Sequence, residues 1–145
     1  MTYTKITTWF LAISMFLFGI LKFINPFKSW YMAQVTNSGL GQLSYVMGIM
    51  GEIAVGLTLL VCLIYRQRIP TKLYALLTTI SFFTIIIVML TGVYVHLNPN
   101  VPADILPLKI KPPYIPIFFL LIALSNIALT TRNNPKARRV KRPNR

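Results

Sequence analysis

Glu52 is the side chain whose presence most needs a chemical explanation, because it is one of two acidic residues in the chain and lies inside the apolar run 43–64. A carboxylate in lipid is costly, so such a residue usually pairs with another charge or lines a functional site. Lys22 is the only cation embedded in an apolar run, and His96, the only histidine, follows a third such run. The sequence therefore places a binding site or an intramembrane charge pair at Lys22, Glu52 and His96.

Three states of Glu52 stay open at this point. It forms an ion pair with Lys22, it is protonated and hydrogen-bonded to Tyr or Ser, or it binds a ligand or proton while Lys22 extends toward the head groups. If the second helix enters at Leu43 and the first leaves at Ile24, Glu52 lies about 14 Å and Lys22 about 3 Å below the boundary. An ion pair then requires the first helix to continue toward Phe27, or the second to begin before Leu43.

The loop from His96 to Pro116 is rich in proline and apolar residues, which predicts a stiff segment that packs as a cap rather than regular structure. A lone histidine more often hydrogen-bonds a loop carbonyl than performs chemistry. Asp104, the only acid of this loop, is expected to pair with Lys109 or Lys111, or to cap a short turn. Pro113 and Pro116 suit the first turn of a following helix.

Four apolar runs position these side chains. Each run is close in length to the ~20 residues that a membrane-spanning helix needs. With 55% hydrophobic and 12% charged residues, the chain departs from a soluble domain. The run after Lys5 lacks a small-residue cleavage pattern, so it is read as a retained helix rather than a signal peptide. The prediction is an all-α integral membrane four-helix bundle in one domain, 1–131, with spans at 6–24, 43–64, 73–95 and 113–130.

Basic residues set the predicted orientation. With four spans, the N-terminus, the second loop and the C-terminal tail share one side, which carries most of the Lys and Arg, so both termini are expected in the cytoplasm. The tail, 132–145, has no apolar face and is expected to be disordered and to contact membrane lipids. The net charge of +13 therefore indicates topology and lipid contact, not nucleic acid binding.

The second span carries small residues every four positions, which form one stripe along a helix. Small residues at this spacing let a neighbouring helix approach closely in lipid, so Glu52 is expected to face protein. Cys62 stands alone, without a partner for a disulfide or the spacing of a metal site, so it is expected to be a packing residue. The predicted helix-packing residues are Gly19, Ser44, Gly48, Gly51 and Gly56.

Two short motifs resemble a known family. The segment Gly19-Ile-Leu-Lys22 and the segment Gly48-Ile-Met-Gly-Glu52 are similar to the G-x-x-K and G-x-x-x-E signatures of the DoxX-like membrane proteins, over about residues 5–130. This resemblance implies a small bacterial protein of the cytoplasmic (inner) membrane. The family is named for a membrane subunit of a thiosulfate:quinone oxidoreductase, and wider relatives act in redox maturation or as chaperones. With Cys62 alone, the chain departs from relatives that use paired cysteines.

The expected function is a non-catalytic membrane subunit or assembly factor of a redox or quinone-linked system. It would bind a lipophilic molecule, with quinone as the candidate, in the outer half of the bundle, and would meet a partner redox protein or a second copy of itself. No nucleophile, metal cluster or phosphate loop indicates an enzyme. The alternative is a small proton- or cation-coupled transporter that uses Glu52.

Overall fold

A computed structural model describes residues 3–132, and all the regular elements in this part of the chain are helices. The predicted all-α class is therefore confirmed for these residues. Of the predicted basic tail, residues 133–145 lie outside the described part. The helices are α1 (Tyr3–Leu21), α2 (Phe27–Asn37), α3 (Gln42–Ile64), α4 (Thr71–Leu97) and α5 (Tyr114–Arg132), with two short 3-10 turns, η1 (Ala103–Ile105) and η2 (Pro107–Lys109).

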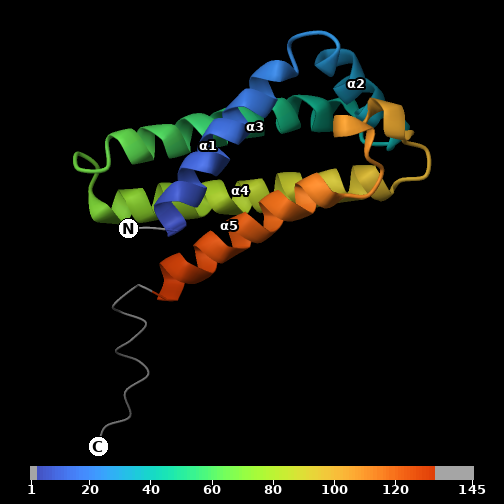
Figure 1. Cartoon of the computed structure of the whole chain (residues 1–145). Helices are drawn as coiled ribbons and strands as arrows, with labels where there is room; N and C mark the ends of the chain where they lie inside the picture. Colours follow the sequence, from blue (N-terminus) through green and yellow to red (C-terminus); the bar gives the residue numbers. More distant parts are fainter. Residues whose placement is uncertain (1–2, 133–145) are drawn as a thin grey trace, which may run out of the picture.

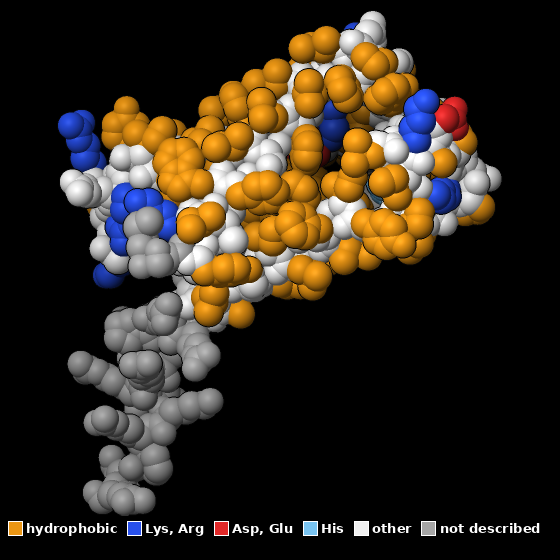
Figure 2. Space-filling view, in the orientation of Figure 1, with side chains coloured by type: hydrophobic (Ala, Val, Ile, Leu, Met, Phe, Trp, Pro, Cys, Tyr) orange, Lys and Arg blue, Asp and Glu red, His pale blue; other side chains and the backbone are white. Residues whose placement is uncertain are grey.

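Three of the described helices, α1, α3 and α4, are long and apolar enough to cross a membrane. The apolar part of α5, Tyr114–Thr130, is a shorter helix. Large apolar side chains cover the outside of these helices, as the orange surface in Figure 2 shows. Met47 and Ile87, for example, are each 64% exposed. Exposed apolar side chains of this size favour lipid over water as their surroundings, as the sequence predicts for a membrane protein.

The four long helices share one apolar core. The antiparallel α3 and α4 lie side by side, α1 crosses α3, and α5 runs along α4 (Figure 1). The first predicted span continued to Ile24, but α1 ends at Leu21, where the chain turns. All four helices contribute side chains to the core, namely Leu11, Ala12, Met15, Val55, Leu59, Phe82, Ile85, Met89, Phe119 and Ala123.

The two ends of the molecule differ in the segments that they hold. The start of α1, the connection between α3 and α4, and the end of α5 lie at one end, while α2, η1 and η2 lie at the other (Figure 1). At the first end, the Arg66 guanidinium lies 4.0 Å from the ring centre of Tyr74. The connection between α3 and α4 also carries Arg68. The segments predicted to share one side of the membrane therefore do lie together.

Helix α2 was not expected from the sequence, which predicted no element between the first two spans. Its eleven residues mix aromatic, polar and apolar side chains without a continuous apolar stripe, so they show no helical pattern. The helix forms because it packs against α3, where the Tyr31 and Tyr45 rings lie 5.1 Å apart. Tertiary packing, not local pattern, determines this element.

The loop after α4 packs as a cap, as its composition predicts. Val101 and Leu106 are buried against Val95 of α4, and Leu40 packs on the same cluster. The loop is more regular than expected, because it forms the two 3-10 turns η1 and η2. Short 3-10 turns accommodate proline well, since they need few backbone hydrogen bonds.

Candidate functional site

The small residues of α3 allow α1 to approach it at backbone distance. A β-carbon built at Gly56 would lie 2.6 Å from the backbone nitrogen of Phe16. A β-carbon at Gly19 would lie 2.5 Å from Cγ1 of Ile53 and 3.3 Å from Cβ of Glu52. Gly19 and Gly56 therefore both contribute to one close contact between α1 and α3, as predicted.

The predicted stripe does not face a single helix, and this corrects the simplest interpretation of its spacing. Gly48 lies against the hydroxyl end of Tyr31 on α2, and not against α1. Gly51 points toward Thr84 and Val88 of α4, with 3.9 Å to each. Ser44, at the start of α3, is half-buried. The stripe therefore serves two neighbours in succession, α2 near the start of α3 and α1 further along.

Lys22 and Glu52 form the predicted ion pair. The Nζ atom of Lys22 donates to Oε1 of Glu52 at 2.6 Å, with 15% and 6% of the two side chains exposed. The first condition stated for this pair, a first helix that continues toward Phe27, is not met, because α1 ends at Leu21. The pair forms because Gly19 places the end of α1 directly beside Glu52. The expectation that Glu52 faces protein is confirmed, since the residue is only 5% exposed.

Tyr31 of α2 is the third member of this cluster, and sequence reasoning missed it. The ring of Tyr31 lies under the Lys22 ammonium, with 3.9 Å between Nζ and the ring centre. Burial, and then the charge of Glu52, raise the pKa of the Tyr31 phenol. The phenol therefore keeps its proton, and its face attracts the Lys22 cation. No spacing rule links Tyr31 to Lys22, because the contact depends on the unpredicted helix α2.

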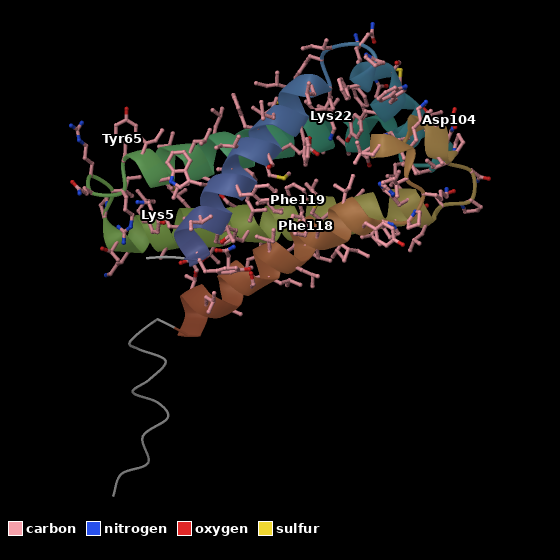
Figure 3. The ribbon with its side chains drawn as sticks, viewed as in Figure 1. Lys5, Lys22, Tyr65, Asp104, Phe118 and Phe119 are labelled. Carbon is pink, nitrogen blue, oxygen red and sulfur yellow. The ribbon has the colours of Figure 1, made fainter. Side chains whose placement is uncertain are left out.

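The cluster lies at the base of a hollow. Figure 2 shows this hollow between the end of α1, α2 and the cap, with blue and red atoms at its bottom. Because the chain has two acidic residues and Asp104 lies on the outer edge of the cap (Figure 3), the red atoms belong to Glu52. The second carboxylate oxygen of Glu52, Oε2, is buried and has no hydrogen-bond partner.

His96 hydrogen-bonds a loop carbonyl group, which is the more common role of a lone histidine. It is buried at the end of α4, and its Nδ1 atom lies 3.2 Å from the carbonyl oxygen of Lys111. This hydrogen bond ties the cap to α4. Among the described residues, no hydrogen bond or ion pair joins His96 to Lys22 or Glu52. The structure therefore brings together two of the three predicted titratable residues.

The predicted pairing of Asp104 is wrong within the described residues. Asp104 is exposed in the first turn of η1, and its side chain neither caps that turn nor forms a salt bridge. Lys109 is exposed as well. Lys111 donates instead to the backbone carbonyls of Asn98 and Val101. These loop carbonyls lie within hydrogen-bond distance of Nζ, whereas the Asp104 carboxylate forms no salt bridge with it, so the backbone satisfies the ammonium group.

Two grooves lie near the hollow, and neither is lined by Lys22 or Glu52. The first, about 320 Å³, runs between α2 and α3. Tyr45, which lines it, contacts the ring of Tyr31, and that ring in turn contacts Lys22. The second, about 410 Å³, is a shallow surface depression beside Leu40 and Tyr94. The first groove is lined by Met32, Val35, Thr36, Leu40, Gln42 and Tyr45.

The described residues offer no set of ligands for a metal ion, since no three His, Cys, Asp or Glu side chains gather. Cys62 is buried and free, as predicted for a packing residue. The arrangement around Glu52 can instead hold a polar group by hydrogen bonds in apolar surroundings. That chemistry is typical of sites for lipophilic ligands.

A second buried polar cluster joins α1 to α5 and was also missed by the sequence reasoning. Asn126, 1% exposed, donates to Thr7 at 2.9 Å, and Thr8 lies 3.5 Å from its carbonyl oxygen. The signal available in the sequence was Asn126 itself, a strongly polar side chain in the middle of an apolar run. This cluster is fully paired among protein groups, so it fixes the helices rather than offering a site.

The whole chain was compared with protein-family models, with curated proteins and with solved structures, and none of the three comparisons finds a match.

Proposed function

We propose that this chain is a DoxX-like integral membrane protein that acts as a non-catalytic subunit or assembly factor of a redox or quinone-linked system. In this proposal it holds a lipophilic molecule at the hollow above Lys22 and Glu52. The observation that carries the proposal is the ion pair itself, 2.6 Å long and buried, at the base of a hollow among apolar helices. Charges in such surroundings usually mark a functional position.

The proposal includes four membrane spans, with α5 as the fourth, and both termini in the cytoplasm. Its support is that Tyr114–Thr130, at about 1.5 Å per residue, approaches the thickness of a bilayer core. A further support is that α5 shares the apolar core with α1, α3 and α4. The hollow then lies in the outer half of the membrane, of bacterial inner-membrane type in this proposal, because α2 and the cap are at the end opposite the start of α1 and the end of α5.

The alternative function, a proton- or cation-coupled transporter that uses Glu52, is less well supported. A carrier of this kind needs a carboxylate that releases its partner during transport. In this structure Lys22 occupies one oxygen of Glu52 and also lies against the ring of Tyr31. The cation is thus held by two groups, and the position resembles a fixed pair more than a site of exchange.

Native mass spectrometry of the protein, gently extracted from its own membrane, tests the proposed function. A redox protein or a quinone that stays bound to the wild-type protein, and is lost from a Lys22→Met/Glu52→Gln variant, would support it. A bare monomer or homodimer that carries no small molecule would contradict it. Proton flux in liposomes would then test the transporter.

A further inference from the structure

Oε2 of Glu52 is the one buried side-chain oxygen or nitrogen among the described residues that has no hydrogen-bond partner. Its sister atom Oε1 accepts from Lys22. Buried polar atoms are paired in the great majority of cases, and one that is not needs an explanation. A molecule bound in the hollow would supply the missing partner.

The chemistry of the missing partner follows from the atoms already present. An ionised carboxylate only accepts hydrogen bonds, so the group that completes Oε2 must donate one. A ligand with only carbonyl or ether oxygens could accept from a further N–H of Lys22, but it would leave Oε2 of Glu52 without a partner. The ammonium group of Lys22 is already held by Oε1 and by the ring of Tyr31. Only a ligand that donates a hydrogen bond therefore completes the carboxylate.

The route to Glu52 is a lateral one. Near the start of α1, Thr7 and Phe10 hold α5 through Asn126 and Phe119. The Phe18 and Phe119 rings still join the two helices one turn before Lys22. Beyond this contact the helices diverge, and the hollow between the end of α1, α2 and the cap opens there on the side of the molecule (Figures 1 and 2). A side that faces away from both ends of a membrane-spanning protein faces lipid. A ligand that arrives this way must be soluble in the bilayer.

We propose that the hollow takes a lipophilic molecule whose polar head is a neutral hydroxyl group, which donates a hydrogen bond to Glu52. This inference rests on the proposed function and specifies its ligand class. In this proposal the hydroxyl group of the ligand donates to Oε2, while Oε1 keeps its hydrogen bond from Lys22. The tail of the ligand lies between α1 and α5. A quinol and a hydroxyl-bearing membrane lipid share this chemistry.

The test is a binding comparison between 4-decylphenol and 4-decylanisole, its methyl ether, which has the same tail but no donor. Native mass spectrometry of the delipidated full-length protein measures how much of each stays bound. Because a hydrogen bond to a charged group is worth more than a neutral one, the wild-type protein is expected to prefer the phenol by at least about tenfold. The Glu52→Gln variant is expected to lose this preference, with a ratio below about threefold.

Two further variants keep the test decisive. Glu52→Gln leaves Lys22 without its partner and lowers stability, so Lys22→Met/Glu52→Gln, which removes both charges, is measured beside it. It is also expected to lose the preference. Lys28→Met, a matched loss of an exposed lysine on α2, is expected to keep it. Two competitors then distinguish the kinds of ligand. If decylhydroquinone displaces the phenol and phosphatidylglycerol does not, the ligand is a quinol. If phosphatidylglycerol displaces it, the ligand is a membrane lipid.

The outcomes separate this inference from the proposed function. If neither probe binds the wild-type protein, the lipophilic site and the proposed function both fail. If both probes bind equally, the lipophilic site stands and the donor requirement is overturned. If the phenol preference survives in both Glu52 variants, the hydroxyl group binds elsewhere and the role of Glu52 is overturned.

Discussion

Gly19 of α1 lies directly against Glu52 of α3, so that a β-carbon at Gly19 would be 3.3 Å from Cβ of Glu52. Helix α1 ends two residues later, at Leu21, whereas α3 continues for a further ten residues toward its start at Gln42. Lys22, the first residue after α1, is thereby level with the carboxylate that it pairs with. The first part of α3 is left to α2, which covers it with Tyr31.

Removal of one charge of the pair should cost more than removal of both. Glu52→Gln leaves a buried lysine without its partner, so we expect a loss of about 3 kcal/mol in the free energy of unfolding. Lys22→Met/Glu52→Gln should lose less, because no unpaired charge remains. Equilibrium unfolding in mixed micelles measures both, with Lys28→Met as the exposed control. Lys22→Met alone completes the cycle, and a double variant that loses the sum of the two single losses would contradict the pair.

The contact between Gly56 and Phe16 should tolerate no side chain. In Gly56→Ala, the new methyl group would meet the backbone of α1 at 2.6 Å, and backbone cannot move aside as a flexible side chain can. We expect a destabilisation of about 1–3 kcal/mol. Gly51→Ala, on the same helix but with 3.9 Å of clearance, should be neutral or slightly stabilising. Equal effects at the two glycines would show that α1 does not pack as described.

Gly48 and Tyr31 should behave as a coupled pair. A methyl group at Gly48 would collide with the Tyr31 hydroxyl, whereas the next ring atom, Cζ, lies 3.2 Å away. We expect Gly48→Ala to destabilise the protein and Tyr31→Phe, which removes the hydroxyl, to reduce that cost. Thermal unfolding of the two single variants and the double variant measures the coupling. A double variant that loses the full sum of both effects would exclude the contact.

Asn126 should hold α5 to α1. In Asn126→Leu the amide that bonds Thr7 is lost, and the hydroxyl groups of Thr7 and Thr8 keep only their own backbone acceptors. Hydrogen bonds between membrane helices are modest, so we expect a loss of about 1 kcal/mol. Ser125→Ala, which removes the exposed bond to Tyr3, should cost less than half as much. A larger effect at Ser125 than at Asn126 would contradict this assignment.

The proposed orientation predicts which loops are reached from outside the cell. In a Cys62→Ala background, a cysteine at Asp104, exposed on the cap, should react with a membrane-impermeant maleimide in intact cells. A cysteine at Arg68, exposed between α3 and α4, should react only after the cells are opened. The labelled fraction is read from a mass shift on a gel. The reverse pattern would place both termini outside.

The long helices could be predicted because apolar runs of this length have few alternatives in lipid. Glu52 and Lys22 stand out for the same reason, since each is a charge where charges are rare. The relative depths of Lys22 and Glu52 in the membrane could not be predicted, because a rise of 1.5 Å per residue gives a depth only for a helix perpendicular to the membrane. The structure has α1 crossing α3, with its end held beside Glu52 by Gly19.

Helix α2, and with it the role of Tyr31, depends on contacts that no local pattern encodes. The same holds for Lys111, whose acceptors at Asn98 and Val101 become close only when the loop folds back. Asp104 was the expected partner of Lys111 because it is the only acidic side chain of the loop. In the folded loop, backbone carbonyl oxygens accept from Lys111 instead. The types of the side chains in a sequence do not indicate which backbone carbonyl groups will accept hydrogen bonds.

The early end of α1 divides the molecule into two regions that should exchange amide hydrogens at different rates. Around Leu59 and Ile85, four helices bury one another, and opening there requires the whole fold to open. Around Tyr31, one short helix and a loop are held by a few side-chain bonds, such as that from Tyr94 to the Ser38 carbonyl. This second region can open by itself while the core stays closed. A ligand bound above Glu52 would therefore slow exchange in α2 first.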